Sequence, residues 1–408
     1  MVEIAPFRGL VYNEDEIKDH GGLLVAPPYD VLSEQQREDC LNLHQHNILH
    51  IDYGQVRPGD ETKYSWHQRS GEILNDWINT GVLTRLDKPA FFHVETSCKN
   101  PQKDGMIIRN GMVCLMRLEE FGPDSQVRPH EKTFSSHKEE RLGLMKSTHA
   151  NRSHVFGFFP DEKREAIEKM TSVTVNNDPD YNFTDYRGFG HKMWINQNEQ
   201  SIKELTDILK EVKIYIADGH HRYETALNYC RWLKENSDNP PASSQYVMIY
   251  LCPMSDPGLV IFPTHRLLNQ KDVHPDDMLN RLSKFFKISG KTFNAENEEL
   301  VRSRFLSKLK KQKNSFGLYM ADRKTYYVIK LLESAREEAT LTGEPKELAA
   351  LDTVVLSNIV FKEALGLTEA DLDNPDIISY VSDLNSAIKK IDRKENSAVF
   401  ILNPRTVE

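Results

Sequence analysis

The residues best suited to chemistry lie at positions 218–222, where the chain reads Asp-Gly-His-His-Arg. Apolar residues alternate before this segment and recur at helical spacing after it, which predicts a corner between a strand and a helix. The first turn of a helix presents unpaired backbone N–H groups that hold anions, and Arg222 would add a planar guanidinium suited to phosphate. Asp218 would bind a metal ion or accept a proton. We therefore expect a loop that handles phosphate.

An ordinary structural explanation covers the same five residues. Asp-Gly is a common tight turn after a strand, and aspartate is a favoured N-cap of a helix. His220 and His221 are adjacent, so on a helix they point about 100° apart and cannot both face one metal ion. The residues alone leave both explanations open.

Three other polar clusters, at 27–30, 128–131 and 263–266, also lie at the ends of predicted strands. Ligand sites in mixed α/β sheets form at strand ends, where loops converge. Phosphoryl transfer requires cations on the phosphates, a divalent metal and a base near the acceptor. The candidate bases or metal ligands are Asp30, Glu131 and Asp218; the candidate cations are Arg128, Arg222 and Arg266; and the candidate proton donors or phosphate ligands are His130, His220, His221 and His265.

Each of these clusters has a structural alternative as well. Glu131 would cap the following helix, Asp30 would be a turn residue after Pro-Pro-Tyr, and His265 would be a core histidine with its polar atoms satisfied. Four such clusters are less easily dismissed than one.

The composition narrows the class of partner. The chain has 408 residues, 39% of them hydrophobic, and a net charge of −9, whereas a nucleic-acid binder normally has a basic excess. We expect a small-molecule substrate and no nucleic-acid or membrane partner. The sequence has no apolar run long enough to span a bilayer, no signal-peptide pattern at its start, and five cysteines without a CxxC pair. These features favour a cytoplasmic protein with reduced thiols; they do not indicate its oligomeric state.

Strands and helices are mixed along the chain, which predicts an α/β (α+β) fold. A change to more highly charged helix–strand units suggests a domain boundary near 270, between a core of residues 1–270 and a C-terminal α+β region of residues 271–408. The predicted helices include 34–43, 62–80, 137–148, 161–170, 275–286, 296–311, 346–364 and 378–391, and the predicted strands include 4–13, 48–52, 90–96, 105–118, 154–159, 172–176, 212–216, 246–251, 258–262 and 398–402, with a hairpin over 315–331.

Five ordered motifs resemble a known family. They are APFRGL, VAPPYDVLS, RPHEKT with a following ERL, ADGHHRYETAL, and PGLVIFPTHRLL. The segments ALDTVVLSNIVFKEALGL and AVFILNP farther along are similar as well. In their order and spacing they resemble the family called domain of unknown function 1015.

The DGHHR segment in turn resembles the phosphate-binding signature of the ParB and sulfiredoxin superfamily. Sulfiredoxins carry a cysteine where His220 or its neighbour stands, so the resemblance does not imply thiol chemistry. Free serine kinases of that superfamily have a similar loop and transfer phosphate from ADP or ATP to L-serine with magnesium. The resemblance therefore implies a ParB/sulfiredoxin-like mixed-sheet core, with Mg²⁺ and ATP or ADP as cofactors.

By this analogy we expect a nucleotide-dependent phosphotransferase acting on a small hydroxy compound, for example a free serine kinase. Asp218 would bind Mg²⁺, and Asp30 or Glu131 would be the base, with His130 nearby. A phosphatase of phosphoserine or a similar monoester is one alternative, and a non-catalytic nucleotide-sensing regulator of ParB type is another. The expected nucleotide or phosphate contacts are Gly219, His220, His221, Arg222, Arg128, His265 and Arg266.

Overall fold

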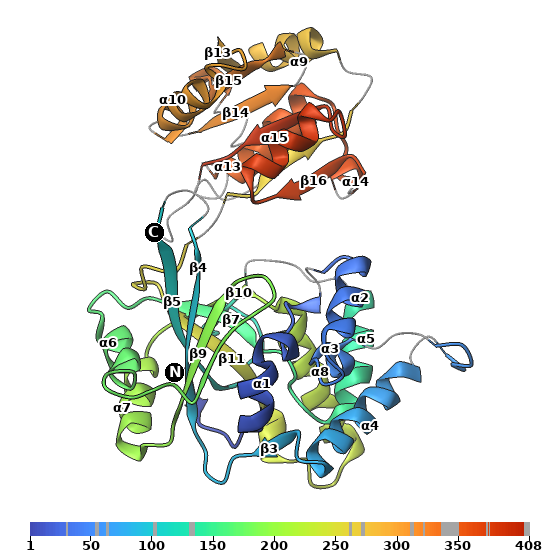
Figure 1. Cartoon of the computed structure of the whole chain (residues 1–408), viewed down its shortest axis with the longest axis vertical. Helices are drawn as coiled ribbons and strands as arrows, with labels where there is room; N and C mark the ends of the chain where they lie inside the picture. Colours follow the sequence, from blue (N-terminus) through green and yellow to red (C-terminus); the bar gives the residue numbers. More distant parts are fainter. Residues whose placement is uncertain are drawn as a thin grey trace. The chain divides into compact units, whose positions relative to one another are not determined.

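The computed structural model divides the chain into two compact units, unit 1 (Met1–Leu259) and unit 2 (Val260–Glu408) (Figure 1). The residues it describes are 1–29, 32–53, 57–62, 65–100, 104–129, 135–260, 263–270, 274–310, 314–320, 323–335, 351–372, 374 and 376–403, with only the backbone described at 135–138.

Unit 1 is built on a nine-stranded mixed sheet. Its strands, in spatial order, are β6 (Val127–Arg128), β10 (Ile214–Asp218), β7 (Val155–Phe159), β11 (Tyr246–Pro253), β5 (Met106–Arg117), β4 (Phe91–Lys99), β9 (Gly190–Asn196) and β8 (Tyr181–Thr184), with β1 (Ile4–Ala5) also paired to β5. The pairs β6–β10 and β7–β11 are parallel, and the other pairs are antiparallel. A separate ribbon joins β2 (Leu10–Tyr12) to β3 (Leu83–Arg85).

Helices cover this sheet and bury its apolar side chains. Figure 1 shows α6 (Glu165–Ser172) and α7 (Glu199–Leu209) on one side, and α5 (Ser135–Thr148) and α8 (His220–Asn236) on the other. All four helices contribute side chains to one core with β5, β7, β10 and β11. The remaining helical segments of unit 1 are α1 (Glu14–Leu24), α2 (Glu34–Leu43), α3 (Leu49–Asp52), α4 (Ser65–Asn79) and a 3₁₀ turn, η2 (Ala242–Gln245).

Unit 2 has a six-stranded antiparallel sheet. Its strands, in spatial order, are β13 (Phe286–Thr292), β15 (Thr325–Leu331), β14 (Ser315–Met320), β17 (Ala398–Ile401), β12 (His265–Leu268) and β16 (Ile378–Val381), and its helices are α9 (Pro275–Ser283), α10 (Glu298–Lys310), α13 (Asp352–Val355), the π-helix η4 (Leu356–Ala364), α14 (Glu369–Leu372) and α15 (Leu384–Asp392).

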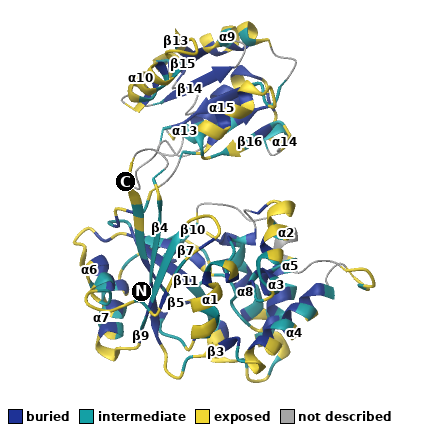
Figure 2. Cartoon of the chain, viewed as in Figure 1, coloured by how far each residue is buried: buried dark blue, intermediate teal, exposed yellow. Residues whose placement is uncertain are grey.

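Two apolar cores lie on opposite faces of this second sheet. α9 and η4 contribute to one core, and α10 and α15 contribute to the other. Every residue of β14 and β17 is consequently buried, and Figure 2 shows β14 in dark blue. The architecture of both units confirms the predicted α+β class with a mixed sheet. In the part of the chain that the structure describes, no helix combines the length and apolarity that a membrane span requires.

Several local predictions are confirmed. Ser33 caps α2, accepting from the N–H of Gln36 (3.3 Å), while the N–H of Ser33 donates to Gln36 Oε1 (2.9 Å). The predicted hairpin at 315–331 is formed by β14 and β15, and the strand–helix corner at 218–220 is formed by β10 and α8. These elements depend on neighbours in sequence, which explains why the sequence predicts them.

Other predictions were wrong. Residues 48–52 form helix α3, because the buried Asn47 side chain accepts from the N–H of Leu49 (3.0 Å) and starts a helical turn. Residues 172–176 continue a turn after α6 and form no strand. The predicted helix 378–391 is strand β16 followed by α15, since Asp383 caps a new helix by accepting from Ser386 N (2.7 Å).

The chain around 260 also differs from expectation. The structure has a turn at 257–258, where the prediction began a strand over 258–262, and the strand is β12 at His265–Leu268. β12 pairs with β16 and β17, so the segment with His265 and Arg266 belongs to unit 2. The cluster at 27–30 follows helix α1 and its extended C-cap, where a strand was expected.

Candidate functional site

The corner between β10 and α8 is set by Gly219. Gly219 has φ +87°, and an added Cβ there would lie 3.1 Å from Arg222 Cζ and 3.3 Å from the backbone of Val155. A larger residue would therefore be strained in conformation and crowded in space. β10 has a register shift between Ile216 and Asp218, which re-aims the end of the strand. No side chain caps the first turn of α8, whose N-cap is Gly219.

Arg222 folds back over this corner. Its guanidinium donates to Ser153 Oγ (3.1 Å), to the carbonyl of His154 and to Asp218 Oδ2. The Asp218 carboxylate is about half exposed, at 51%, whereas the Arg222 side chain is only 9% exposed. Asp218 thus holds a buried cation in place. His220 is buried, and His221 is partly buried.

A small arginine-lined cavity lies behind this corner. It has a volume of about 30 Å³, and three arginines from different parts of unit 1 line it together with a single carboxylate, that of Asp52. The lining residues are Tyr29, Asp52, Arg141, Met145, Ala150, Asn151, Arg152, Ser153, Arg222 and Thr225. The described lining thus holds three guanidiniums and one carboxylate, while Asp218, which lies outside the lining, pairs with Arg222. Guanidiniums gathered in this way suit an anion.

Asp52 neutralises part of this charge. Its Oδ1 accepts from Arg141 Nη1 (3.3 Å) and Arg152 Nε (3.2 Å), and its carbonyl accepts from Arg141 Nη1 (2.8 Å). Both arginine side chains are less than a tenth exposed. Arg141 also stacks on Tyr29, with Cζ 3.0 Å from the ring centre. These contacts hold the guanidiniums rigidly.

Some buried donors at the cavity lack an acceptor in the part of the chain that the structure describes. Among the described residues, Arg141 Nε, Arg141 Nη2 and Thr225 Oγ1 are buried without a hydrogen-bond partner, although Nη2 lies in an ion pair with Glu140 Oε1 at 3.9 Å. Leaving a buried donor unpaired costs about 1–3 kcal/mol. Because these three groups line one positively charged cavity, we infer that they serve an anionic ligand.

Burial also shifts the proton affinities around the cavity. Desolvation lowers the pKa of the Arg152 guanidinium, an effect that Asp52 opposes and Arg141 reinforces. Burial, with help from the charges of Arg152 and Arg141, lowers the pKa of His67 to about 4. Burial, with the charge of Arg222, likewise lowers the pKa of His154 to about 4. Both imidazoles are therefore neutral at pH 7, and the positive charge comes from the arginines alone.

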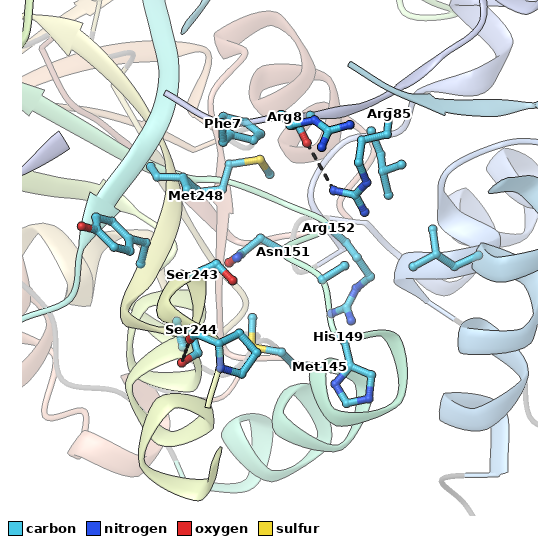
Figure 3. A pocket seen from close by; sticks show the side chains of 18 of the residues that line it. Phe7, Arg8, Arg85, Met145, His149, Asn151, Arg152, Ser243, Ser244 and Met248 are labelled. Carbon is cyan, nitrogen blue, oxygen red and sulfur yellow. Dashed lines mark hydrogen bonds between the residues drawn. The ribbon is translucent and has the colours of Figure 1, made fainter. Parts of the chain in front are cut away.

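A much larger cavity adjoins the small one. Its volume is about 760 Å³, within the range of about 300–1,000 Å³ usual for ligand pockets, and it shares Met145, Ala150, Asn151 and Arg152 with the small cavity. Figure 3 shows Arg8 and Arg85 at one end of this view and His149 and Ser244 at the other, with Arg152 and Asn151 between them. Most of the lining is apolar, including Phe7, Leu115 and Met248.

The remaining predicted site residues have different surroundings. Arg128 ends β6 and donates to the carbonyls of Gly122 (2.9 Å) and Pro123 (2.7 Å), so its guanidinium fastens a turn. β6 runs parallel to β10, and both strands therefore end at the same edge of the sheet. Asp30, His130 and Glu131 lie outside the described residues.

The two candidates in unit 2 lie on β12. His265 is 3% exposed, and its Nδ1 accepts from the backbone N–H of Leu402 (3.2 Å). Burial lowers the pKa of His265 to about 4, which keeps the ring neutral. Arg266 lies over the ring of Tyr380, with Cζ 4.8 Å from the ring centre. The interpretation of His265 as a satisfied core histidine fits this environment.

Sequence reasoning missed Asp52, Arg141 and Arg152. Arg141 lies in the ERL segment that carries the family resemblance, and Arg152 comes two residues before the predicted strand 154–159. The polar clusters were sought only after predicted strands. Including the polar residues just before each strand would also have identified Arg152. No local pattern marked Asp52, which the sequence assigns to a predicted strand. Its contacts are with Arg141 and Arg152, which lie 89 and 100 residues farther along the chain.

Comparisons with known structures identify weak likenesses. Three chains match this one. A conserved hypothetical protein from Pyrococcus furiosus is 12% identical, with 69% of this chain and 78% of that chain covered and a TM-score of 0.26. Two structures of free serine kinase in complex with AMP, one of them of a mutant, are each 12% identical and cover 69% of this chain and 75% of those, with TM-scores of 0.29 and 0.27.

No curated protein matches the chain. The family model described as a protein of unknown function, DUF1015, matches residues 4–354, a range that includes the β10–α8 corner and both cavities. The chain therefore belongs to the DUF1015 family.

Proposed function

We propose that unit 1 binds a nucleotide and transfers a phosphoryl group to a small hydroxy compound. One observation carries the proposal: among the described residues, three arginines and Asp52 are the charged groups that line a cavity adjoining a larger, mostly apolar one. Phosphoryl transfer depends mainly on positioning and on cations around the phosphates. A nucleotide joins an aromatic base to an anionic phosphate. The larger, mostly apolar cavity would suit the base, and the smaller, arginine-lined cavity would suit the phosphate.

The nucleoside would occupy the larger cavity, and phosphate oxygens would enter the smaller one. A cavity of about 30 Å³ holds roughly two water molecules, hence two oxygens of a phosphoryl group. Arg141, Arg152 and Arg222 would surround these oxygens, and the backbone N–H groups at the start of α8, at His220 and His221, would add partial positive charge. Gly219 would allow the close approach.

Asp218 would be a suitable protein ligand for a metal ion whose other ligands come mainly from the bound nucleotide. Mg²⁺ typically uses one or two carboxylates, with phosphate oxygens and water as its other ligands, and Asp218 is a half-exposed carboxylate beside the arginine cavity. A bound Mg²⁺ would neutralise charge developing on the phosphates. Arg222, which pairs with Asp218, would hold this carboxylate in position.

The proposed reaction needs an acceptor hydroxyl and a base that takes its proton. By analogy with the resemblance of the Asp-Gly-His loop, the acceptor would be a free hydroxy amino acid such as serine, on a ParB/sulfiredoxin-like core. Asp30 or Glu131 would accept the proton of its hydroxyl, with His130 nearby. The AMP-bound free serine kinases lend no support of their own, since their TM-scores are below 0.3.

Binding should depend on the cavity arginines and not on arginine in general. We expect Arg222→Ala to weaken nucleotide binding by about 2–3 kcal/mol, or roughly 30- to 150-fold in Kd, because a hydrogen bond to a charged phosphate is lost. Arg128→Ala is the matched control, since that guanidinium contacts only turn carbonyls in the described structure. Calorimetric titration with AMP, ADP and ATP, with and without Mg²⁺, measures both. Equal affinities in the two variants would refute the phosphate role.

Turnover separates the proposed reaction from its alternatives. The full chain is incubated with serine, Mg²⁺ and ADP or ATP, and phosphoserine is measured by ³¹P NMR. Phosphoserine formed only with nucleotide supports a kinase. Phosphate released from phosphoserine without nucleotide would point to a phosphatase, and tight nucleotide binding without any turnover would point to a sensing regulator.

A further inference from the structure

Unit 1 contains a second polar cluster, formed by Glu16, His44 and His46. One potential ligand atom from each of the three side chains lies within 4.8 Å of the other two. Within the described residues, this is the group of histidine, cysteine and acidic side chains whose geometry could hold a metal ion. The three side chains belong to neither of the two cavities described above.

The cluster joins two separate elements. Glu16 lies in the first turn of α1, where the Asn13 side chain accepts from its backbone N–H (2.8 Å). His44 is the C-cap of α2, and His46 follows in the turn before α3. The turn is fixed against its surroundings by Tyr12, whose hydroxyl donates to the carbonyl of His46 (2.8 Å). The ligand atoms are therefore held by groups around them, as in preorganised metal sites.

One carboxylate oxygen in this cluster is unsatisfied. Glu16 Oε1 accepts from or shares a proton with His46 Nδ1 (2.9 Å), whereas Glu16 Oε2 is buried and has no hydrogen-bond partner in the described part of the chain. A buried carboxylate oxygen without a partner is costly. A cation among Glu16, His44 and His46 would satisfy it.

We propose that Glu16, His44 and His46 form a binding site for a first-row divalent metal ion, with Zn²⁺ as the expected occupant. Two imidazoles and one carboxylate are a ligand set that Zn²⁺ accepts, whereas Mg²⁺ and Ca²⁺ prefer oxygen ligands throughout. Tetrahedral Zn²⁺ with bonds of about 2.0–2.1 Å places its ligand atoms about 3.3 Å apart. The Glu16–His46 pair is already close to this separation, and modest rotamer changes would bring in His44.

Two hydrogen bonds would be given up on binding, the one between Glu16 Oε1 and His46 Nδ1 (2.9 Å) and one at His44. His44 Nδ1 accepts from the backbone N–H of His46 (3.1 Å), and coordination through either ring nitrogen removes this acceptor. Water would complete the coordination. The bound ion would link α1 to the turn between α2 and α3, so its effect is to stabilise unit 1, independently of the nucleotide site.

The test uses the full chain without a histidine tag. Zn²⁺ is titrated calorimetrically into metal-free protein, the ratio of bound metal is measured by mass spectrometry, and unfolding temperatures are recorded with Zn²⁺ and with Mg²⁺. We expect one Zn²⁺ to bind per chain and to raise the unfolding temperature. Mg²⁺ should leave the unfolding temperature unchanged. Bound Co²⁺ should show the visible spectrum of a four-coordinate site.

Variants connect the binding to these residues. His46→Ala and Glu16→Gln should each weaken Zn²⁺ binding by at least about tenfold, the lower end of the loss seen when even outer-shell partners are removed. Glu16→Gln retains the size of the side chain, so it should not disturb folding. Circular dichroism of each variant checks this. The control is His274→Ala, an exposed histidine of unit 2. The proposal fails if the wild type binds no Zn²⁺, or if His46→Ala and Glu16→Gln bind it as tightly as His274→Ala.

Discussion

Two polar segments at strand ends, 218–222 in unit 1 and 264–266 in unit 2, have different surroundings. Arg222 lies beside a cavity that two further buried arginines line, whereas Arg266 stacks on Tyr380, a ring that is 57% exposed. His265 is packed into an apolar core with its Nδ1 satisfied. Similar residue types therefore lie beside an arginine-lined cavity in one unit and within side-chain packing in the other.

The interiors of the two units differ in the same way. Among the residues described in unit 2, the buried polar side chains are those of His265, Ser315 and Thr325. Unit 1 buries many more, and these include charged groups such as Asp52 and Arg141. Buried charge costs stability unless something compensates it. The comparison shows that unit 1 holds buried charged groups, whereas the described interior of unit 2 is mainly apolar.

The largest effect is expected from the buried charges of unit 1. Asp52→Ala would leave Arg141 and Arg152 without their carboxylate and should lower the free energy of unfolding by about 3–5 kcal/mol. Added sulfate or phosphate should restore part of that loss by replacing the charge. Urea unfolding measures both effects. Glu3→Ala, which breaks the exposed pair with Arg117, is the control and should cost at most about 1 kcal/mol. If Asp52→Ala lowered the free energy of unfolding by as little as Glu3→Ala does, the buried charges would not distinguish unit 1 from unit 2.

Acid should destabilise unit 1 more than unit 2. Burial lowers the pKa of His67, His93 and His154 in unit 1, and of His265 in unit 2, to about 4. Since these pKa values lie below the unfolded value of about 6.5, the unfolded chain binds more protons between pH 6.5 and 4, and stability falls as pH falls through that window.

For His265 the expected loss is about 2 kcal/mol by pH 5. Hydrogen exchange of peptides from β12 and β17, compared with β7 and β11 at pH 7.5 and pH 5, separates the two units. His265→Leu should make unit 2 less stable at pH 7.5 but insensitive to this change of pH. Equal acid sensitivity of the wild type and His265→Leu in unit 2 would contradict the assignment.

A smaller effect is expected at the β10–α8 corner. Gly219→Ala should cost about 1–2 kcal/mol because an L-residue is strained at φ +87°, and its Cβ would also press on Arg222. Gly81→Ala is the matched control, with φ +80° and nothing within 4 Å of the added carbon. Both variants should lose similar stability in thermal unfolding, but only Gly219→Ala should weaken nucleotide binding. If Gly219→Ala and Gly81→Ala bound nucleotide equally well, the β10–α8 corner would not be part of the nucleotide site.

The smallest effects should be the same in both units. Ser33→Ala removes the cap of α2 in unit 1, and Asp383→Ala removes the cap of α15 in unit 2. Each should lower the free energy of unfolding by about 1 kcal/mol, because each loses one side-chain acceptor at a helix start. A large difference between the two, measured by urea unfolding, would mean that the units differ in more than their buried charges.

The sequence by itself determined the features that depend on near neighbours. The Ser33 capping box, the glycine corner at 219 and the alternation of apolar residues in β10 each involve residues a few positions apart. The sequence therefore predicted these elements and the α+β class, while the roles of Asp218 and Arg222 stay predictions. The family resemblance added the ERL segment that contains Arg141.

The tertiary structure alone decided which charges meet. Asp52, Arg141, Arg152 and Arg222 come from a helix end, a helix interior, a loop and a helix start, and no local pattern indicates that they share one cavity. Asn47 converted the apolar run 48–52 from an expected strand into the helical turn that ends at Asp52. His265 was drawn into the core of unit 2 by pairing with β16 and β17. Long-range contacts settle such positions, because the burial that fixes a side chain's partner and charge is a property of the whole fold.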